Sequence, residues 1–268
     1  MKVFVIDIDK CSGCHNCQIA CKDEHCGNDW MPYAAPQPNS GQFWMRVKQK
    51  DHGQVPKVRV EYTPWMCMHC DEPACKAAAP DAVSKRDDGL VLIDPVASKG
   101  KRQIVDACPY GAVFYNEDLD IPQKCTGCAH LVDEGEIPHC VDLCATGALR
   151  FGEESEFASE IAAAETFDIN GAGPRVYYLN LPHLFIGGEV WDPKANEVIE
   201  GAQVTLTMPD GTTRTASTDD FGDFWFRRID AGTYGIRIEA AGFKPVERTS
   251  IQLTDSLNLG DFPLETAE

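Results

Sequence analysis

The sequence predicts an α+β protein with a cysteine-rich domain at residues 1–183 and a seven-stranded β-sandwich at residues 184–268. Its 268 residues suit two domains. All thirteen cysteines lie between Cys11 and Cys144, so the two parts of the chain differ in chemistry. From about Leu184, short alternating apolar runs are separated by turn signals such as Pro209-Asp-Gly211, a spacing typical of a sandwich.

Composition narrows the classes of partner. The formal net charge is −18, and no block of lysine or arginine offers a footprint for nucleic acid or for an anionic membrane surface. No apolar run approaches the roughly 18 to 20 residues of a transmembrane helix, and Asp7 and Asp9 interrupt the start in a way foreign to a signal peptide. We therefore expect no nucleic-acid partner, no transmembrane segment and a cytoplasmic location. Export to the periplasm together with a partner that carries a signal stays open.

The spacing of the cysteines favours iron–sulfur clusters. A disulfide framework is disfavoured by the odd number of cysteines and their tight spacing. Cys125-x2-Cys128 with Cys140-x3-Cys144 would suit zinc on its own. However, Cys11-x2-Cys14-x2-Cys17-x3-Cys21 has the bacterial ferredoxin spacing, in which three cysteines bind one [4Fe–4S] cube and the fourth reaches another. The sequence therefore predicts paired ferredoxin-like modules, with zinc as the weaker alternative.

This crossing rule assigns two clusters. Cys21 follows Cys17 by four residues, as Cys144 follows Cys140, so each of these last cysteines is expected to serve the other module's cube. We define set one as Cys11, Cys14, Cys17 and Cys144. We define set two as Cys21, Cys125, Cys128 and Cys140.

The middle of the chain predicts a third cluster and an abandoned fourth. Cys67-x2-Cys70-x4-Cys75 together with Cys108 supplies four more thiolates, defined here as set three. The four positions expected to hold the remaining cube carry other residues: Ala79, Ser98, Lys101 and Ile104. Because the four missing thiolates belong to one site, we expect three [4Fe–4S] clusters. We expect side chains near Ala79, Ile104 and Val105 to fill the vacated volume, since an empty cavity is costly.

The remaining features receive ordinary structural interpretations. Cys26 is expected to be a free buried thiol. Lys22, Arg46 and Lys124 lie near the motifs and could raise a cluster potential, although a solvated surface charge is the default expectation for each. Histidines near the motifs are expected to pack or to form hydrogen bonds around the cubes: His25, His69 and His139. Trp30, Trp44 and Trp65 are expected to be core or interface aromatics. Asp219, Asp220 and Asp223 are interpreted as turn formers. Apolar periodicity predicts a strand at residues 3–8 and a helix over residues 153–167.

Several segments resemble the iron–sulfur electron-transfer subunits of the molybdopterin oxidoreductase superfamily, above all small subunits of the pyrogallol–phloroglucinol transhydroxylase type. They are Cys21–His25, Pro64–Cys70, Leu90–Pro95, Cys108–Gly111, Gln123–Leu131 and Pro174–Tyr178. The resemblance implies a heterodimer whose large subunit holds molybdenum or tungsten on molybdopterin guanine dinucleotide and transfers, adds or removes hydroxyl groups on a polyphenol. This chain would relay electrons and carry no catalytic residue. Residues 184–268 separately resemble a carboxypeptidase-regulatory-like sandwich.

Two other functions remain open from sequence alone. The chain could be a free polyferredoxin carrier, although its large insertions and added sandwich argue against a small diffusing protein. Alternatively, the partner enzyme could act on a non-aromatic substrate, because the substrate is chosen in the partner chain. The sandwich itself could be a docking module.

Overall fold

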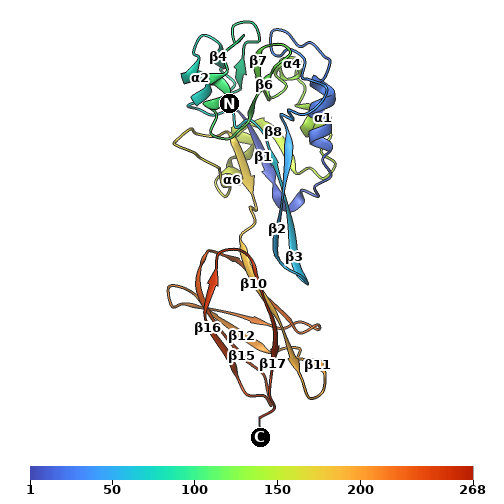
Figure 1. The fold of residues 1–268 in the computed structure, drawn as a ribbon, viewed down its shortest axis with the longest axis vertical. Coiled ribbons are helices and arrows are strands. Elements are labelled where there is room, and N and C mark those ends of the chain that lie inside the picture. Colours follow the sequence, from blue (N-terminus) through green and yellow to red (C-terminus); the bar gives the residue numbers. More distant parts are fainter. Residues whose placement is uncertain (268) are drawn as a thin grey trace. The chain divides into compact units, whose positions relative to one another are not determined.

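A computed structural model describes residues 1–267, which form two compact units (Figure 1). The first unit comprises residues 1–49 and 62–181, and the second comprises residues 50–61 and 182–268. Residues 50–61 thus lie outside the cysteine-rich unit in which the sequence predicts them. They group with the second unit because Gln54 and Lys57 bond to Ser256 and Asp223 there.

The first unit is built of short elements that alternate with the cysteine loops. Its strands are β1 (Lys2–Asp7), β2 (Arg46–Gln54), β3 (Lys57–Trp65), β4 (Val83–Lys85), β5 (Val91–Ile93), β6 (Val113–Asn116), β7 (Ile121–Lys124), β8 (Leu149–Glu153) and β9 (Val176–Leu179). The middle of the β2–β3 hairpin, residues 50–61, belongs to the second unit. Its helices are α1 (Asn16–His25), α2 (Ala74–Ala78), α3 (Gln103–Asp106), α4 (Ala129–Asp133), α5 (His139–Asp142) and α6 (Ala158–Ile161), with 3-10 turns η1 (Ile8–Lys10) and η2 (Glu154–Phe157).

Strand β1 is the centre of this unit, as its apolar run predicts. Its residues Val3 to Asp7 are buried, and it pairs antiparallel with β8 and parallel with β9. In Figure 1 these strands lie beneath the helices and loops that carry the cysteines. Hairpins β4–β5 and β6–β7 complete the scaffold. No helix among residues 1–267 has the length and apolar character needed to cross a bilayer.

The expected helix over residues 153–167 is wrong for most of its length. Only η2 and the four-residue α6 form, and Glu165 instead bonds to Tyr178 as an isolated bridge with two backbone hydrogen bonds of 2.8 Å. The ring of Phe167 packs against Trp65 and Tyr178, with centroids 5.0 and 4.9 Å away. This packing draws the segment into an extended conformation, which local periodicity does not reveal.

The second unit is a sandwich of two four-stranded sheets. Its strands are β10 (Leu184–Asp192), β11 (Glu197–Val198), β12 (Gln203–Thr207), β13 (Thr213–Ser217), β14 (Asp223–Ile229), β15 (Gly232–Glu239), β16 (Val246–Leu253) and β17 (Leu257–Pro263). The described part of the chain therefore holds eight strands here rather than seven. The additional strand is β11, whose two exposed residues show no alternation.

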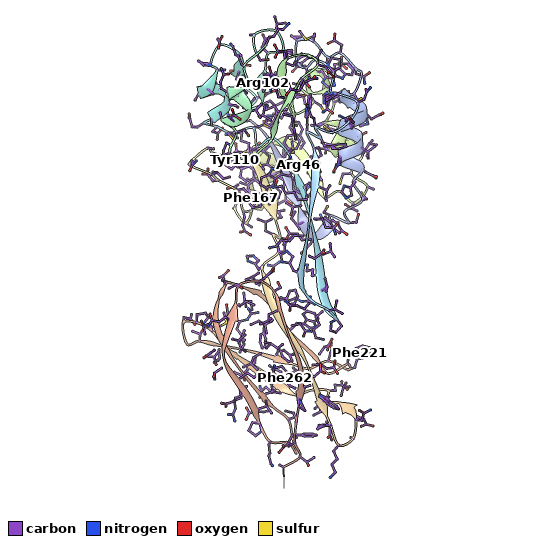
Figure 2. The ribbon with its side chains drawn as sticks, in the orientation of Figure 1. Arg46, Arg102, Tyr110, Phe167, Phe221 and Phe262 are labelled. Carbon is purple, nitrogen blue, oxygen red and sulfur yellow. The ribbon has the colours of Figure 1, made fainter. Side chains whose placement is uncertain are left out.

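Alternating residues of the two sheets form the core of the sandwich. Val204, Leu206, Ile236 and Ile238 are buried on inward faces, as expected from their spacing. Figure 2 shows Phe262 inside this unit and Phe221 at its edge, where 70% of Phe221 is exposed. The aspartates at residues 219–223 include a turn former, as predicted, because the Asp219 carboxylate accepts hydrogen bonds from the N–H groups of Phe221 and Asp223.

Candidate iron–sulfur centres

Three loops with one backbone shape present the CxxC pairs. In each loop the residue before the second cysteine has a positive φ: 67° at Gly13, 45° at His69 and 67° at Gly127. Glycine suits this conformation, whereas a histidine there is unusual and indicates a constrained site. Backbone N–H groups in two of the loops point at sulfur, from His69 to Cys67 at 3.4 Å and from Gly127 to Cys125 at 3.3 Å.

The four thiols of set three line one small, mostly apolar pocket. Cys67, Cys70, Cys75 and Cys108 all face it, together with apolar side chains that include Met68, Val91 and Val113. The cysteines come from segments up to 41 residues apart, brought together by β3, α2 and the turn after α3. All of them are free thiols. Four thiols around one mostly apolar space fit the chemistry of a [4Fe–4S] cube.

The four thiols of set one lie near one another, and so do the four thiols of set two. In set one, the charges of Cys11, Cys14 and Cys144 act on Cys17. In set two, Cys21 lies near Cys125 and Cys128, and Cys140 lies near the same three residues. That each set binds a cluster remains a prediction. Burial raises the pKa of Cys17, Cys125 and Cys128 to about 12, so loading with metal must displace protons there.

Neighbouring cysteines link set two to each of the other two sets. Cys17 of set one is close enough to Cys21 and Cys140 of set two for their charges to interact. Cys125 of set two has the same relation to Cys67 of set three. Set two therefore lies near both set one and set three.

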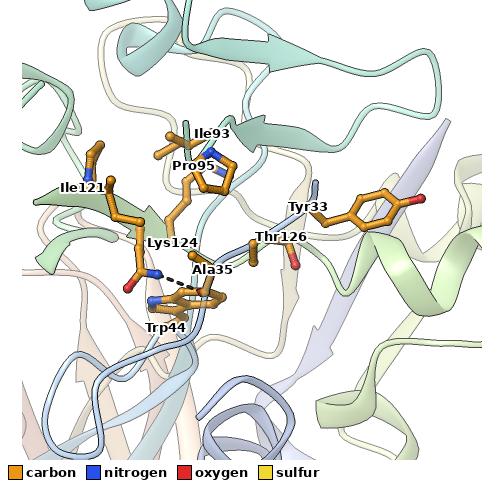
Figure 3. Close-up of a pocket in the computed structure, with 11 residues that line it drawn as sticks. Tyr33, Ala35, Trp44, Ile93, Pro95, Ile121, Lys124 and Thr126 are labelled. Carbon is orange, nitrogen blue, oxygen red and sulfur yellow. Dashed lines mark hydrogen bonds between the residues drawn. The ribbon is translucent and has the colours of Figure 1, made fainter. Parts of the chain in front are cut away.

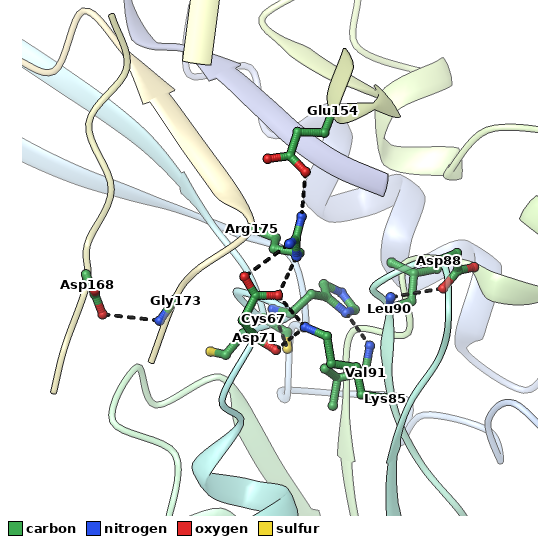
Figure 4. A network of polar contacts seen from close by, with 12 residues as sticks. Cys67, Asp71, Lys85, Asp88, Leu90, Val91, Glu154, Asp168, Gly173 and Arg175 are labelled. Atoms are coloured by element: carbon green, nitrogen blue, oxygen red, sulfur yellow. Dashed lines mark hydrogen bonds and ion pairs between the residues drawn. The ribbon is translucent and has the colours of Figure 1, made fainter. Parts of the chain in front are cut away.

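A polar network fixes the loop that carries Cys67 and Cys70 (Figure 4). Arg175 donates to the carboxylate of Asp71 through Nε at 2.6 Å and Nη2 at 3.1 Å, and to Glu154 through Nη1 at 3.1 Å. Lys85 donates to the same carboxylate and to the Cys70 carbonyl, at 2.6 and 2.7 Å. Burial raises the pKa of Asp71, but these cations outweigh it and leave that pKa below its usual value.

Two polar residues near the thiols, Glu24 and His130, were not singled out from the sequence, whereas hydrogen bonding by His25 and His139 was expected. Glu24 accepts hydrogen bonds from His130 at 2.9 Å and His139 at 2.6 Å, while the Nε2 atom of His25 lies 3.8 Å from the sulfur of Cys128. In the sequence, the signal for Glu24 was its place next to His25 in the Lys-Asp-Glu-His run after Cys21. Trp44 and Trp65 are buried as expected, whereas Cys26 is only half-buried.

The expectation for Lys124 is wrong. Its side chain is 3% exposed, at the end of a strand whose four residues are all buried. Its ammonium donates to the carbonyls of Val91 and, at 3.0 Å, Cys125. Burial lowers the pKa of Lys124, but the neighbouring charges of Cys67, Cys75 and Cys125 outweigh it and raise the pKa above its usual value.

Side chains pack the position at which the sequence predicts no fourth cluster. Ala79 and Ile104 are buried in a core cluster with Ala82, Val83 and Ile93, and Val105 packs against it. Ser98 is fully buried, and Lys101 forms an ion pair with Asp81. Of the four positions without a thiolate, three are therefore buried and only Lys101 is partly exposed.

Similarity to known protein families and to individual proteins identifies the family of this chain. Residues 58–154 match the model of the 4Fe-4S dicluster domain, and residues 186–265 match the carboxypeptidase regulatory-like domain. The pyrogallol hydroxytransferase small subunit of Pelobacter acidigallici is 35% identical, covering 96% of this chain and 97% of the relative. The protein belongs to the family of iron–sulfur electron-transfer subunits of molybdopterin oxidoreductases.

Other members of this family match the cysteine region. A subunit of the tetrathionate reductase of Salmonella typhimurium is 32% identical over 68% of this chain and 74% of its own. A chain of the anaerobic dimethyl sulfoxide reductase of Escherichia coli is 38% identical over 57% of this chain and 74% of its own. The transhydroxylase relative is thus matched along nearly its whole length, whereas these two are matched over part of theirs.

Proposed function

We propose that this electron-transfer subunit carries three [4Fe–4S] clusters, one in each set of cysteines. The observation that carries the proposal is the cavity lined by all four thiols of set three. The grouping of the other eight thiols into two crossed fours supports the same interpretation for sets one and two. When bound, each cluster supplies a site that accepts and returns one electron.

The proximity of set two to both other sets supports a continuous path for electrons. Cys17 next to set two, and Cys125 next to Cys67, leave no set isolated from the others. The fourth position lies beside set three, because Cys75 belongs to the core cluster that fills it. The absent cluster would then have been terminal, and the survivors form a shortened path rather than leaving one cluster stranded.

The partner is proposed to be a large catalytic subunit that holds molybdenum or tungsten on molybdopterin guanine dinucleotide. The near full-length match to a pyrogallol hydroxytransferase small subunit supports a partner that transfers hydroxyl groups on a polyphenol. The second match, to the carboxypeptidase regulatory-like domain, supports the sandwich at residues 184–268 as a distinct module after residues 1–183. A partner that acts on a non-aromatic substrate is the competing interpretation, supported by the dimethyl sulfoxide and tetrathionate reductase relatives.

Iron content and cysteine substitutions test the clusters. We expect about twelve irons and about twelve sulfides in each loaded protein, four of each for every cube. Cys21→Ser should remove the set-two cluster and leave the set-one signal, although Cys21 is adjacent in sequence to set one. Cys26→Ser is the matched control, since this half-buried thiol contacts Asn39 rather than another cysteine. Unchanged set-two spectra in Cys21→Ser would refute crossed ligation.

Co-purification tests the partner. Tagged protein purified from the cells that naturally produce it should bring down a second polypeptide that contains molybdenum or tungsten, and the pair should turn over pyrogallol. A loaded protein that elutes alone under the same conditions would favour the free carrier instead. A pair without activity on polyphenols would favour the reductase alternative and would not affect the proposal of three clusters.

A further inference from the structure

A buried positive charge separates set two from set three. Lys124 ends β7, directly before Cys125 of set two, and it also lines the cavity of set three. Lys124 also lines a second pocket, together with Trp44, Ile93 and Ile121 (Figure 3). Only 3% of Lys124 is exposed, so water contributes almost nothing to stabilising the ammonium.

The ammonium is held in place by backbone oxygens. It donates to the carbonyls of Val91 and Cys125. The N–H of Val91 in turn donates to Nδ1 of His69 at 3.0 Å, which ties both Lys124 and the set-three loop to β5. A charge anchored on rigid strands cannot swing towards solvent when its surroundings change.

The countercharge comes from cysteines. Within residues 1–267, no aspartate or glutamate forms an ion pair with Lys124. The groups near it that would carry the countercharge, once they are thiolates, are Cys67, Cys75 and Cys125. A buried charge is costly unless it is compensated. Two of the three cysteines belong to set three and one belongs to set two, whereas none belongs to set one.

We propose that Lys124 is a positioning residue whose fixed charge makes the set-three cluster easier to reduce, makes the set-two cluster easier to reduce to a smaller extent, and leaves the set-one cluster unaffected. This inference rests on the proposed function. Uptake of one electron from the reductant makes a four-thiolate site more negative by one charge, with no proton required, and a neighbouring cation favours that change. In a low-dielectric interior the attraction is weakly screened. The effect should be larger at set three, which supplies two of the three neighbouring thiolates.

Redox titration of the full-length protein, purified without oxygen, tests this. Sodium dithionite is the reductant, and electron paramagnetic resonance follows each cluster; the signal lost in Cys108→Ser identifies set three. In Lys124→Gln we expect the equilibrium constant for reducing the set-three cluster to fall at least about tenfold, which is about 59 mV for one electron. A smaller fall is expected at set two and none at set one. Lys124→Arg, which keeps the charge, should stay within about threefold of the wild type.

Lys85→Gln is the matched control. Lys85 also contacts the set-three loop, through the Cys70 carbonyl, but the carboxylate of Asp71 neutralises it at 2.6 Å. Removing it should shift set three far less than removing Lys124 does. An equal shift in all three sets, or a shift in Lys124→Arg as large as in Lys124→Gln, would overturn the proposal.

The iron content of the variants distinguishes a failure of the Lys124 proposal from a failure of the proposed function. If Lys124→Gln and Lys124→Met both lose the set-three iron while the wild type keeps it, Lys124 serves assembly and the electrostatic proposal falls. If the wild type itself lacks three clusters, the proposed function has failed before Lys124 is considered.

Discussion

Arg175 holds Asp71 through two parallel hydrogen bonds, Nε–Oδ1 at 2.6 Å and Nη2–Oδ2 at 3.1 Å. The guanidinium is 7% exposed, and Asp71 directly follows the set-three thiol Cys70. The pair therefore joins the segment before β9 to the loop of set three. The match of a planar fork to a carboxylate depends on arginine and is not reproduced by lysine.

We expect Arg175→Lys to weaken the loaded protein by about 1 to 3 kcal/mol, since charged hydrogen bonds of this kind are lost. Thermal unfolding followed by circular dichroism measures the change. Arg102→Lys is the control, because Arg102 makes the same two-pronged contact with Glu117 at the surface, where its side chain is 58% exposed. An equal loss of unfolding free energy in the two variants would show that the burial of Arg175 does not strengthen its contact with Asp71.

A second prediction concerns Gly127, between the set-two thiols Cys125 and Cys128. Its φ is +67°, and an added Cβ would lie 2.7 Å from a methyl group of Leu90. Gly127→Ala should therefore cost the protein the set-two cluster, a loss of about four irons, measured by iron analysis and resonance spectra. Gly135→Ala shares the positive φ, at +86°, but meets nothing within 4 Å. It should cost only about 1 kcal/mol of backbone strain and keep all its iron.

The sequence indicated the family and its thiols more readily than their surroundings. The regular spacing around Cys11 and Cys125 is local, so it can be recognised without a structure. Lys124 could not be placed in this way, because its burial depends on Val91 and Cys67, which lie far from it in the sequence. A lysine is normally exposed, and only the buried neighbours of β7 would have argued otherwise.

The same limit explains the errors in secondary structure and grouping. The segment at residues 162–167 has helical periodicity, yet Phe167 packs against Trp65 and Tyr178. Lys57 is buried in the second unit through its contact with Asp223, across 166 positions of sequence. Such long-range contacts decide the outcome for short elements, whereas a strongly apolar strand such as β1 forms where its own pattern predicts.

A third prediction concerns pH. Hydrogen bonds from Arg86, and then from Tyr33, lower the pKa of Asp133 to about 2. Because the folded pKa lies below the ordinary value of 3.8, the stabilising contribution is complete above about pH 4 and is lost as pH falls towards 2. The carboxylate is 37% exposed, so solvent screening limits the effect to about 0.5 to 1 kcal/mol.

Urea unfolding of the wild type and of Asp133→Asn at several pH values checks this. The difference between the two proteins should be largest above pH 4 and shrink towards pH 2, and taking the difference cancels the acid lability that both share. Glu117→Gln, at an exposed ion pair elsewhere in the unit, serves for comparison. A difference that grows on acidification would contradict the expected sign.

The last prediction concerns the filled fourth position. Ile104 is fully buried there, so Ile104→Ala should cost about 2 to 5 kcal/mol through lost burial and the cavity left behind. Val96→Ala is the control, since Val96 is 72% exposed and should change stability little. Restoring one thiol by Ala79→Cys should leave iron at about twelve atoms per protein, because Ser98, Lys101 and Ile104 supply no thiolate and Ala82, Val83 and Ile93 occupy the space. Iron rising towards about sixteen in Ala79→Cys would mean that the position still accepts a cube. Unchanged iron with an unstable Ile104→Ala would instead show that the core has replaced the cofactor as the structural centre of that module.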